Sequence, residues 1–316
     1  MRGEEGFLNQ GGEAMQPLPR RLTLAARVLG LAMAIGCSQA YFGTEGVVSG
    51  PVAPGDSAVV LAAGDIASCR TSGDELTAAL LDTLPGLVLA LGDNAYASGS
   101  AAEYQTCYAP TWGRHLGRTR AIPGNHDYHT PGAAAYFAYY GERAGPAGRG
   151  WYSFDVGAWH VVALNSNAPM SRGSEQERWL RADLAAHPRR CTLALMHHPR
   201  FSSGMHGDNS AVAPLWRALQ EAGADVVLSG HDHLYERFLR MTADGRPDAD
   251  RGIRSFVVGT GGARHVGFFR RAAGSQVRYD GHWGLLRLTL RADRYEWEFI
   301  TGADGQRLDH GEDRCR

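Results

Sequence analysis

The sequence predicts an α/β fold, a four-layer α/β/β/α sandwich in which two mixed β-sheets pack together with helices outside. From residue 57 on, the first half of the chain alternates strand-like apolar runs with helical segments, a pattern typical of βαβ units. The last third carries mostly strand-like runs. Strands with interleaved helices followed by strands alone fit two mixed sheets, because each sheet must bury an apolar face against another layer.

The first half is expected to lead from alternating strands and helices into a β-hairpin. Residues 151–156 and 159–164 alternate apolar and polar side chains and meet at Gly157-Ala158, which predicts the hairpin. The elements expected before it are strands at 58–63, 87–91 and 120–122 and helices at 74–82 and 101–107.

The clearest helical pattern covers residues 174–186. Ser174 is the expected N-cap, and Glu177 three residues later would complete a capping box. The elements expected elsewhere are a helix at 214–222 and strands at 191–196, 225–228, 255–258, 283–290 and 295–300. The 316-residue chain shows no internal repeat, so we expect a single catalytic domain over 57–316 with a sizeable buried core.

Residues 1–40 have the pattern of an export signal, and residues 41–56, rich in Gly, Ser, Val and Pro, are expected to form a linker. Arg20-Arg21 precedes an apolar stretch whose uninterrupted part, 28–36, is too short for a membrane span of ~20 residues. The stretch ends in Ala34-Ile35-Gly36-Cys37, which is similar to a bacterial lipobox. Two outcomes stay open: a lipid anchor on Cys37, or cleavage near Ala40. The product would be periplasmic, lipid-anchored or extracellular.

The cysteines also favour an oxidising compartment. Apart from Cys37 there are four, none in a Cys-x-x-Cys pair, and an even number in an exported protein suggests two disulfides. Of three possible pairings we expect Cys69–Cys107, since each lies in a loop leaving a polar segment, and Cys191–Cys315. The net charge of −1 gives no basic excess, which argues against nucleic acid as the main partner.

Five short segments rich in metal-ligand residue types follow predicted strands. Oxygen and nitrogen ligands at successive strand ends would point into one crevice. Hydrolysis of a phosphate ester needs such ligands, because two cations about 4 Å apart neutralise the phosphate and lower the pKa of water. The segments are Gly64-Asp65, Gly92-Asp93-Asn94-Ala95-Tyr96, Gly124-Asn125-His126-Asp127, Met196-His197-His198 and Gly230-His231-Asp232-His233.

Together, over roughly residues 57–300, these segments closely resemble the calcineurin-like metallophosphoesterase superfamily, and within it the purple acid phosphatases. The resemblance implies two metal sites that share the Asp93 carboxylate as a bridge. One metal would be held by Asp65, Asp93, Tyr96 and His233, and the other by Asp93, Asn125, His197 and His231. His126, which follows a ligand Asn, would face the substrate.

Tyr96 distinguishes the branch of the superfamily. Many relatives begin with Asp-x-His, but here Asp65 is followed by Ile66-Ala67, so that His is missing. Gly-Asp-x-x-Tyr instead resembles the purple acid phosphatases, in which a phenolate binds the metal. A phenolate is a hard anionic donor, so the resemblance implies Fe(III) with a divalent ion, either Fe, Zn or Mn.

The proton donor to the leaving alcohol stays open among three histidines. The large members of the branch carry a His pair downstream of the ligand that matches His197, whereas this chain offers His206 in that neighbourhood and His198 beside the ligand. His126, His198 and His206 are therefore the candidate catalytic residues.

The pattern as a whole predicts an exported, acid phosphatase-like hydrolase of phosphomonoesters. Metal-bound hydroxide would attack phosphorus in line, and a histidine would protonate the leaving alkoxide. A phosphodiesterase that uses the same site on nucleotides or phospholipid head groups is the alternative. A non-catalytic phosphate-binding module is a third possibility. The membrane would be a partner only through a lipid on Cys37, and the oligomeric state is left open.

Overall fold

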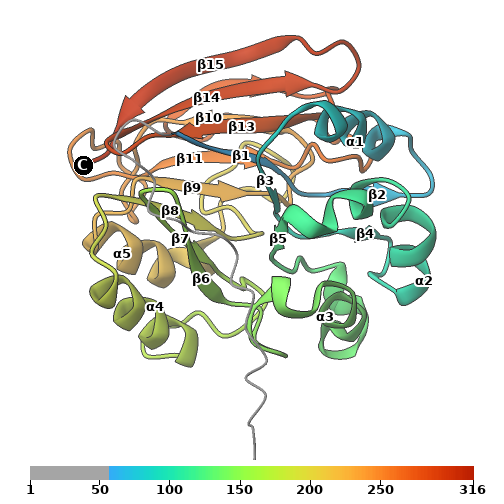
Figure 1. The fold of residues 1–316 in the computed structure, drawn as a ribbon. Helices are drawn as coiled ribbons and strands as arrows, with labels where there is room; N and C mark the ends of the chain where they lie inside the picture. Colours follow the sequence, from blue (N-terminus) through green and yellow to red (C-terminus); the bar gives the residue numbers. More distant parts are fainter. Residues whose placement is uncertain (1–56) are drawn as a thin grey trace, which may run out of the picture. The chain divides into compact units, whose positions relative to one another are not determined.

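The computed structural model describes residues 57–316, which form the predicted sandwich of two mixed β-sheets with helices on the outer faces (Figure 1). The export segment 1–40 with Cys37 and the linker 41–56 lie outside the described residues, so their assignment stays a prediction. Among the described residues, no helix has the length and apolarity needed to cross a membrane.

The first sheet has the strand order β15-β14-β13-β1-β3-β5. Its strands β1, β3 and β5 are parallel, whereas β13, β14 and β15 join them in antiparallel pairs. The carboxyl ends of the three parallel strands consequently share one edge. The bounds are β1 (Ala58–Ala63), β3 (Leu87–Ala90), β5 (Thr119–Ala121), β13 (Gly284–Leu290), β14 (Arg294–Thr301) and β15 (Arg307–Arg314).

The second sheet has the order β12-β10-β11-β9-β8-β7-β6. Strands β7, β8, β9 and β11 are parallel, and β6 and β7 form the predicted hairpin. The bounds are β6 (Tyr152–Val156), β7 (Trp159–Ala163), β8 (Cys191–Leu195), β9 (Val226–Ser229), β10 (Tyr235–Phe238), β11 (Arg254–Val258) and β12 (Ser275–Tyr279). A short parallel pair, β2 (Ala67–Ser68) and β4 (Ala95–Tyr96), lies beside the first sheet.

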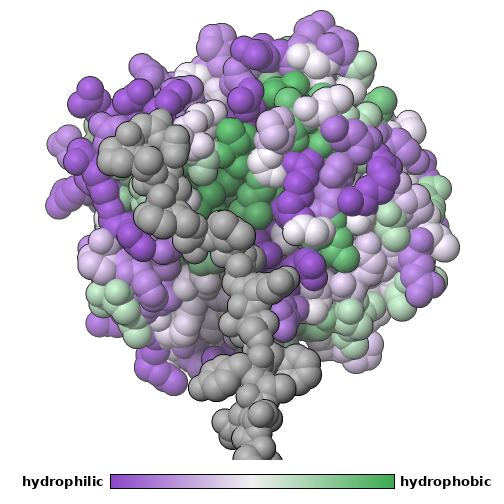
Figure 2. Space-filling view, in the orientation of Figure 1, coloured by the Kyte–Doolittle hydropathy of each residue, from purple (hydrophilic) through white to green (hydrophobic). Residues whose placement is uncertain are grey.

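The helices cover opposite sides of the sandwich. In Figure 1, α4 (Glu175–Ala186) and α5 (Ala213–Glu221) lie against the second sheet, and α1 (Gly73–Thr83) lies against the first. The short helices α2 (Ala101–Glu103) and α3 (Ala134–Tyr140) lie near the ends of β4 and β5. In the same orientation, Figure 2 shows apolar residues near the middle of this face and polar residues around them.

Successive side chains along the strands of the second sheet point to opposite faces of the sheet, so these strands contribute to two hydrophobic cores. Val161, Leu193 and Val226 point toward the first sheet and belong to the core between the sheets. Their neighbours Val162 and Ala194 point the other way and pack in a second core with residues of α4 and α5. Both faces of the parallel strands are therefore buried, which explains their nearly continuous apolar sequences.

Most predicted elements are confirmed, with three differences. Segment 101–107 is not one α-helix: after α2 the chain continues as a π-helical turn, Tyr104–Tyr108. The capping box of α4 is incomplete, because Glu177 accepts a hydrogen bond from the amide of Gly173 instead of that of Ser174. Strands β2, β4, β10, β12 and β15 and helix α3 are additional to the elements expected.

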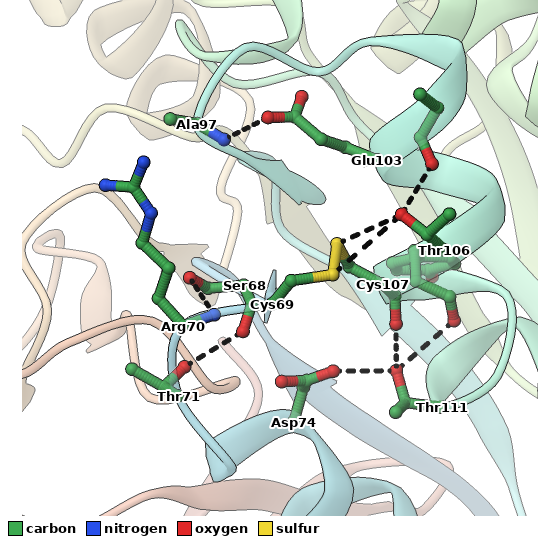
Figure 3. Close-up of a disulfide and its surroundings, with 12 residues drawn as sticks. Ser68, Cys69, Arg70, Thr71, Asp74, Ala97, Glu103, Thr106, Cys107 and Thr111 are labelled. Carbon is green, nitrogen blue, oxygen red and sulfur yellow. Dashed lines mark hydrogen bonds between the residues drawn. A yellow bond between two sulfur atoms is a disulfide. The ribbon is translucent and has the colours of Figure 1, made fainter.

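Both predicted disulfides are confirmed. Cys69 is bonded to Cys107 and Cys191 to Cys315. Figure 3 shows the first, which ties the loop after β2 to the π-helical turn. The second ties the end of the chain to the start of β8.

Candidate metal centre

The five polar segments meet at the carboxyl ends of β1, β3 and β5 of the first sheet and β8 and β9 of the second. Asp65 and Asp93 follow β1 and β3, and both adopt left-handed backbone conformations with φ of 59° and 50°. His231, after β9, does the same with φ of 73°. Non-glycine residues adopt this conformation at a cost, so its repetition at three ligand-type residues marks a functional site.

The phenolic oxygen of Tyr96 is the centre of a first group of side chains. It lies 2.8 Å from Oδ1 of Asp65, 3.0 Å from Oδ2 of Asp93 and 3.1 Å from Nε2 of His233. One hydroxyl proton cannot satisfy two carboxylates and an imidazole at once, whereas a cation among the four donors would satisfy all of them. This group therefore has the chemistry to hold a metal ion.

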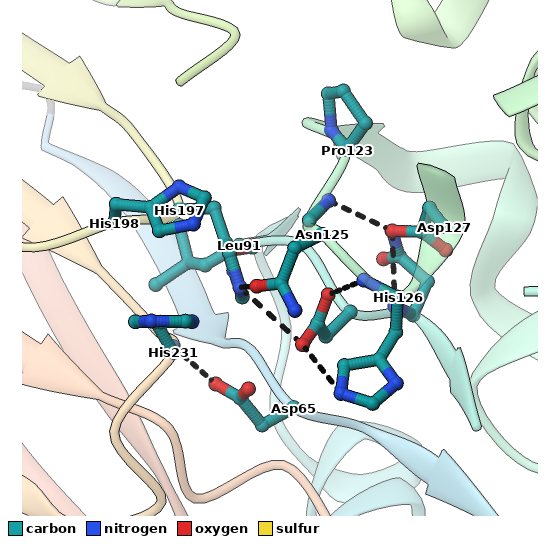
Figure 4. A network of polar contacts seen from close by, with 12 residues as sticks. Asp65, Leu91, Pro123, Asn125, His126, Asp127, His197, His198 and His231 are labelled. Atoms are coloured by element: carbon teal, nitrogen blue, oxygen red, sulfur yellow. Dashed lines mark hydrogen bonds and ion pairs between the residues drawn. The ribbon is translucent and has the colours of Figure 1, made fainter. Parts of the chain in front are cut away.

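A second group shares Asp93 with the first. Nε2 of His197 lies 3.4 Å from Oδ2 of Asp93 and 3.2 Å from Oδ1 of Asn125. Asp93, His197 and His231 each offer a ligand atom within 4.8 Å of the others. Figure 4 shows Asn125, His197 and His231 entering the same space from different loops. The structure thus brings all seven predicted ligands into two groups with one carboxylate in common.

Backbone carbonyls orient two of the imidazoles. Nδ1 of His197 lies 2.9 Å from the carbonyl of Leu91, and Nδ1 of His233 lies 2.7 Å from that of Arg264. Because Nδ1–H donates to a carbonyl in each ring, Nε2 faces the site and carries the lone pair whenever the ring is neutral. This is the tautomer that a metal ligand requires.

The carboxylates of Asp65 and Asp93 raise the pKa values of three side chains of the site. Burial disfavours charge on His197, but Asp93 outweighs this effect and raises the pKa of His197 to about 9. Burial likewise opposes charge on His233, and Asp65 raises its pKa to about 9. Burial together with Asp65 and Asp93 raises the pKa of Tyr96 well above its usual range. The site thus attracts positive charge, whether protons or cations.

His126 is held beside the shared carboxylate by a chain of hydrogen bonds. Its Nδ1 lies 2.6 Å from the carbonyl of Ala97, which leaves Nε2 facing the site, 3.9 Å from Oδ2 of Asp93. The amide of Ala97 in turn donates to Glu103, whose carboxylate also accepts from Ser98 and Ser100. Glu103 therefore fixes the turn that orients His126.

The other two candidate histidines lie on the side of His231. The His206 ring lies 4.0 Å from the His231 ring, tilted by 33°, and its Nδ1 lies 2.9 Å from Oδ1 of the buried Asp232. His198 lies 4.4 Å from the His231 ring, with Nδ1 2.7 Å from the hydroxyl of Ser166. Burial and the charge of His197 lower the pKa of His198 to about 3, so that it stays neutral near pH 7.

Asp127 holds the loop that presents Asn125 and His126. Its carboxylate accepts hydrogen bonds from the amide of Gly124, the side chain of Asn94 and the hydroxyl of Tyr104, at 2.7–3.0 Å. The carboxylate is fully buried, so it acts only by positioning the loop.

Sequence reasoning did not assign roles to several residues that position the candidate histidines, either directly or through a neighbouring residue. Asp232 lies between two ligand histidines in the sequence, and this spacing is a signal that could have identified it. Glu103 occupies the last position of a Ser-x-x-Glu capping box, which indicates a helix start but not its contact with Ala97. Ser166 lies in a loop without a distinctive pattern.

The sequence is similar to that of known phosphoesterases. A family model described as calcineurin-like phosphoesterase matches residues 58–235. The chain is similar to purple acid phosphatase 15 of Arabidopsis thaliana, with 28% identity over 238 residues that cover 64% of this chain and 44% of the relative. A phosphoenolpyruvate phosphatase of Allium cepa is 27% identical over 249 residues, covering 66% of this chain and 51% of the relative. The chain thus spans about half the length of these curated relatives.

Solved structures share the fold. A purple acid phosphatase from yellow lupin (Lupinus luteus) seeds has a TM-score of 0.73 at 18% identity, covering 83% of this chain and 54% of that one. A dimetal phosphatase from Danio rerio has a TM-score of 0.54 at 13% identity, covering 84% of this chain and 100% of that one. At these identities the similarity concerns the fold alone.

Proposed function

The chain belongs to the calcineurin-like phosphoesterase family, and we propose that it is an exported phosphatase that hydrolyses phosphomonoesters with the help of two metal ions. Its similarity to purple acid phosphatases supports a metal-dependent hydrolase of phosphoric esters. The observation that carries the proposal is the position of the Asp93 carboxylate, 3.0 Å from the Tyr96 hydroxyl and 3.4 Å from His197. One carboxylate shared by two donor groups is the arrangement that a bridged metal pair requires.

We assign the donors to the two ions as the family resemblance implies. Tyr96 is a hard anionic donor suited to Fe(III), and the group of Asn125, His197 and His231 suits a divalent ion such as Fe, Zn or Mn. When bound, the two ions neutralise phosphate charge and lower the pKa of water. The protein fixes the donors by strained backbone at Asp65, Asp93 and His231 and by carbonyl contacts to His197 and His233.

The three candidate histidines take different roles in this proposal. His126 directs Nε2 toward the shared carboxylate, so it binds a phosphate oxygen as charge develops. His206, whose Nδ1–H is held by Asp232 and whose side chain is 42% exposed, serves as the proton donor to the leaving alkoxide. His198 is buried and neutral, and it contributes by packing against His231.

Initial rates on two chromogenic esters test the proposal. We expect metal-reconstituted protein to hydrolyse para-nitrophenyl phosphate well above bis-para-nitrophenyl phosphate, and Asp93→Asn to lose the activity. Preference for the diester would replace the proposal with a phosphodiesterase. Inactivity on both esters with metals bound would mean either a narrow substrate outside these two esters or a phosphate-binding module.

Export is supported by the disulfides, because structural disulfides persist mainly in oxidising compartments. Mass spectrometry of the mature protein tests this part of the proposal. An N-terminus at a lipid-modified Cys37 would identify an anchored form, and one near Ala40 a released form. A reduced, uncleaved protein in the cytoplasm would contradict export.

A further inference from the structure

A pocket of about 550 Å³ opens directly beside the first group of ligand-type side chains. Tyr96 and His233 form the wall that it shares with the candidate metal centre. The Cys69–Cys107 disulfide forms another part of the lining, to which Arg70 and Arg264 also belong. A phosphate held at the metal centre would therefore lie next to this pocket, and an alcohol portion that extends past Tyr96 and His233 would enter it.

The two arginines leave positive charge uncompensated in the pocket. Over residues 57–316, neither Arg70 nor Arg264 makes an ion pair within 4.0 Å, although many other arginines do so. The one carboxylate in the lining, Glu103, is already engaged by the amides of Ala97, Ser98 and Ser100 and by the Ser100 hydroxyl. A pocket with two unpaired guanidinium groups and one satisfied carboxylate favours an anion.

Both arginines are attached to rigid parts of the site. The carbonyl of Arg264 accepts the hydrogen bond that orients His233, so its side chain starts at a fixed distance from the centre. Arg70 follows Cys69, and the next residue, Thr71, donates to the carbonyl of Gly262 at 2.7 Å. Figure 3 shows the Arg70 side chain extending away from Thr71 toward the side of Ala97. The chain bearing Arg70 is thus fixed at two adjacent residues.

We propose that this pocket binds a second anionic group on the alcohol portion of the substrate, so that Arg70 and Arg264 select phosphomonoesters carrying a carboxylate or another phosphate. The inference rests on the proposed function and narrows its substrate class. Guanidinium groups suit this task because they remain charged and bind carboxylate or phosphate oxygens in pairs. An ester with a neutral alcohol portion would leave both arginines without a partner.

Matched esters test the proposal. We would compare kcat/KM for para-carboxyphenyl phosphate and para-phenylene bisphosphate with that for the neutral para-carbamoylphenyl phosphate. The wild type should prefer at least one anionic ester by about tenfold. Preference for the carboxylate alone or the bisphosphate alone identifies which anion the pocket takes. In Arg70→Gln/Arg264→Gln this preference ratio should fall toward one, and each single variant should give an intermediate ratio.

Arg190→Gln is the matched control. Arg190 is exposed and immediately precedes β8, at the opposite end of the strand from His197, so the ratio should stay at the wild-type value. A wild-type ratio near one for both anionic esters, or an unchanged ratio in the double variant, would overturn the proposal.

A binding measurement separates this proposal from the proposed function. Calorimetry on metal-loaded protein would compare para-carboxyphenylphosphonate with phenylphosphonate, neither of which can be hydrolysed as an ester. Tighter binding of the carboxylated compound, lost in the double variant, supports the pocket even if no ester is turned over. Equal binding by the wild type contradicts the pocket even if para-nitrophenyl phosphate is hydrolysed rapidly.

Discussion

Oδ1 of Asp232 lies 2.9 Å from Nδ1 of His206, and the same carboxylate accepts hydrogen bonds from the His206 amide and the Ser202 hydroxyl. Asp232 also lies between the two ligand-type histidines at 231 and 233. One buried carboxylate therefore links the proposed proton donor to the segment that would hold both metals. This link gives the imidazole a fixed orientation although His206 lies in an exposed loop.

Replacing His206 should affect poor leaving groups more than good ones. We expect His206→Gln to lose about 10²-fold more kcat/KM on ethyl phosphate than on para-nitrophenyl phosphate, because only the alkoxide needs a proton to depart. His126→Gln should lose similar factors on both esters, since it would bind phosphate oxygens common to both. Equal losses in His206→Gln would exclude it as the proton donor.

Tyr96 should give the iron-loaded protein a colour. A phenolate bound to Fe(III) absorbs visible light by charge transfer, so the wild-type protein reconstituted with iron should show a visible band. Tyr96→Phe should lack the band, whereas Tyr139→Phe, a substitution in the tyrosine cluster around Tyr104, should keep it. An unchanged band in Tyr96→Phe would show that another donor binds the iron.

The Cys191–Cys315 disulfide should make a large contribution to stability. It closes a loop with a sequence separation of 124 residues and ties the end of β15 to β8. Replacing both cysteines with serine should lower the free energy of unfolding by about 4 kcal/mol, measured by urea titration. Because the bond lies away from the candidate metal centre, para-nitrophenyl phosphate hydrolysis at low temperature should persist. Equal stability of the two proteins would contradict this account.

Stability should also depend on pH through His160, which is buried between two carboxylates. Burial opposes its charge, but hydrogen bonds to Asp183 and Asp155 at 2.8 and 2.9 Å raise the pKa of His160 above its usual 6.5. His187 stacks on the ring, and Arg189 pairs with Asp155. Because the pKa of His160 is higher in the folded than in the unfolded protein, protonated His160 adds to the free energy of unfolding. This contribution is fully present below about pH 6.5 and is lost as the pH rises through the folded pKa.

Urea unfolding between about pH 6 and pH 9 tests whether the stabilisation by His160 decreases as the pH rises. His160→Gln should be less stable than the wild type by about 2 kcal/mol at the acidic end, and the difference should shrink toward pH 9. His310→Gln, at an exposed position on β15, should show no such trend. A pH-independent difference for His160→Gln would mean that His160 is neutral in the folded protein.

The parallel strands could be predicted from the sequence because burial on both faces makes them continuously apolar. β15 could not, since it lies at the edge of the first sheet and reads Arg-Leu-Asp-His-Gly-Glu-Asp-Arg, with charges that discourage pairing with other chains. β12 is also an edge strand, and most of its side chains are half-buried or exposed.

In the candidate metal centre, too, some features could be predicted from the sequence and others could not. Ligand-type residues were predictable because they follow strands that end at a common edge. The contacts that orient them were not, because the carbonyls of Leu91, Ala97 and Arg264 act through the backbone and leave no mark on residue identity. Arg70 gave no signal either, since its place in the pocket depends on the neighbouring disulfide.

Metal content measured together with activity tests the central claim, that Asp93 joins two metal ions in one catalytic centre. Elemental analysis of the reconstituted wild type should find two ions per chain, with para-nitrophenyl phosphate hydrolysis rising until the second is bound. Asp93→Asn should hold fewer than two and lose activity by at least about a thousandfold, roughly 4 kcal/mol of transition-state stabilisation. An Asp93→Asn protein that retains two ions and wild-type activity would contradict the account.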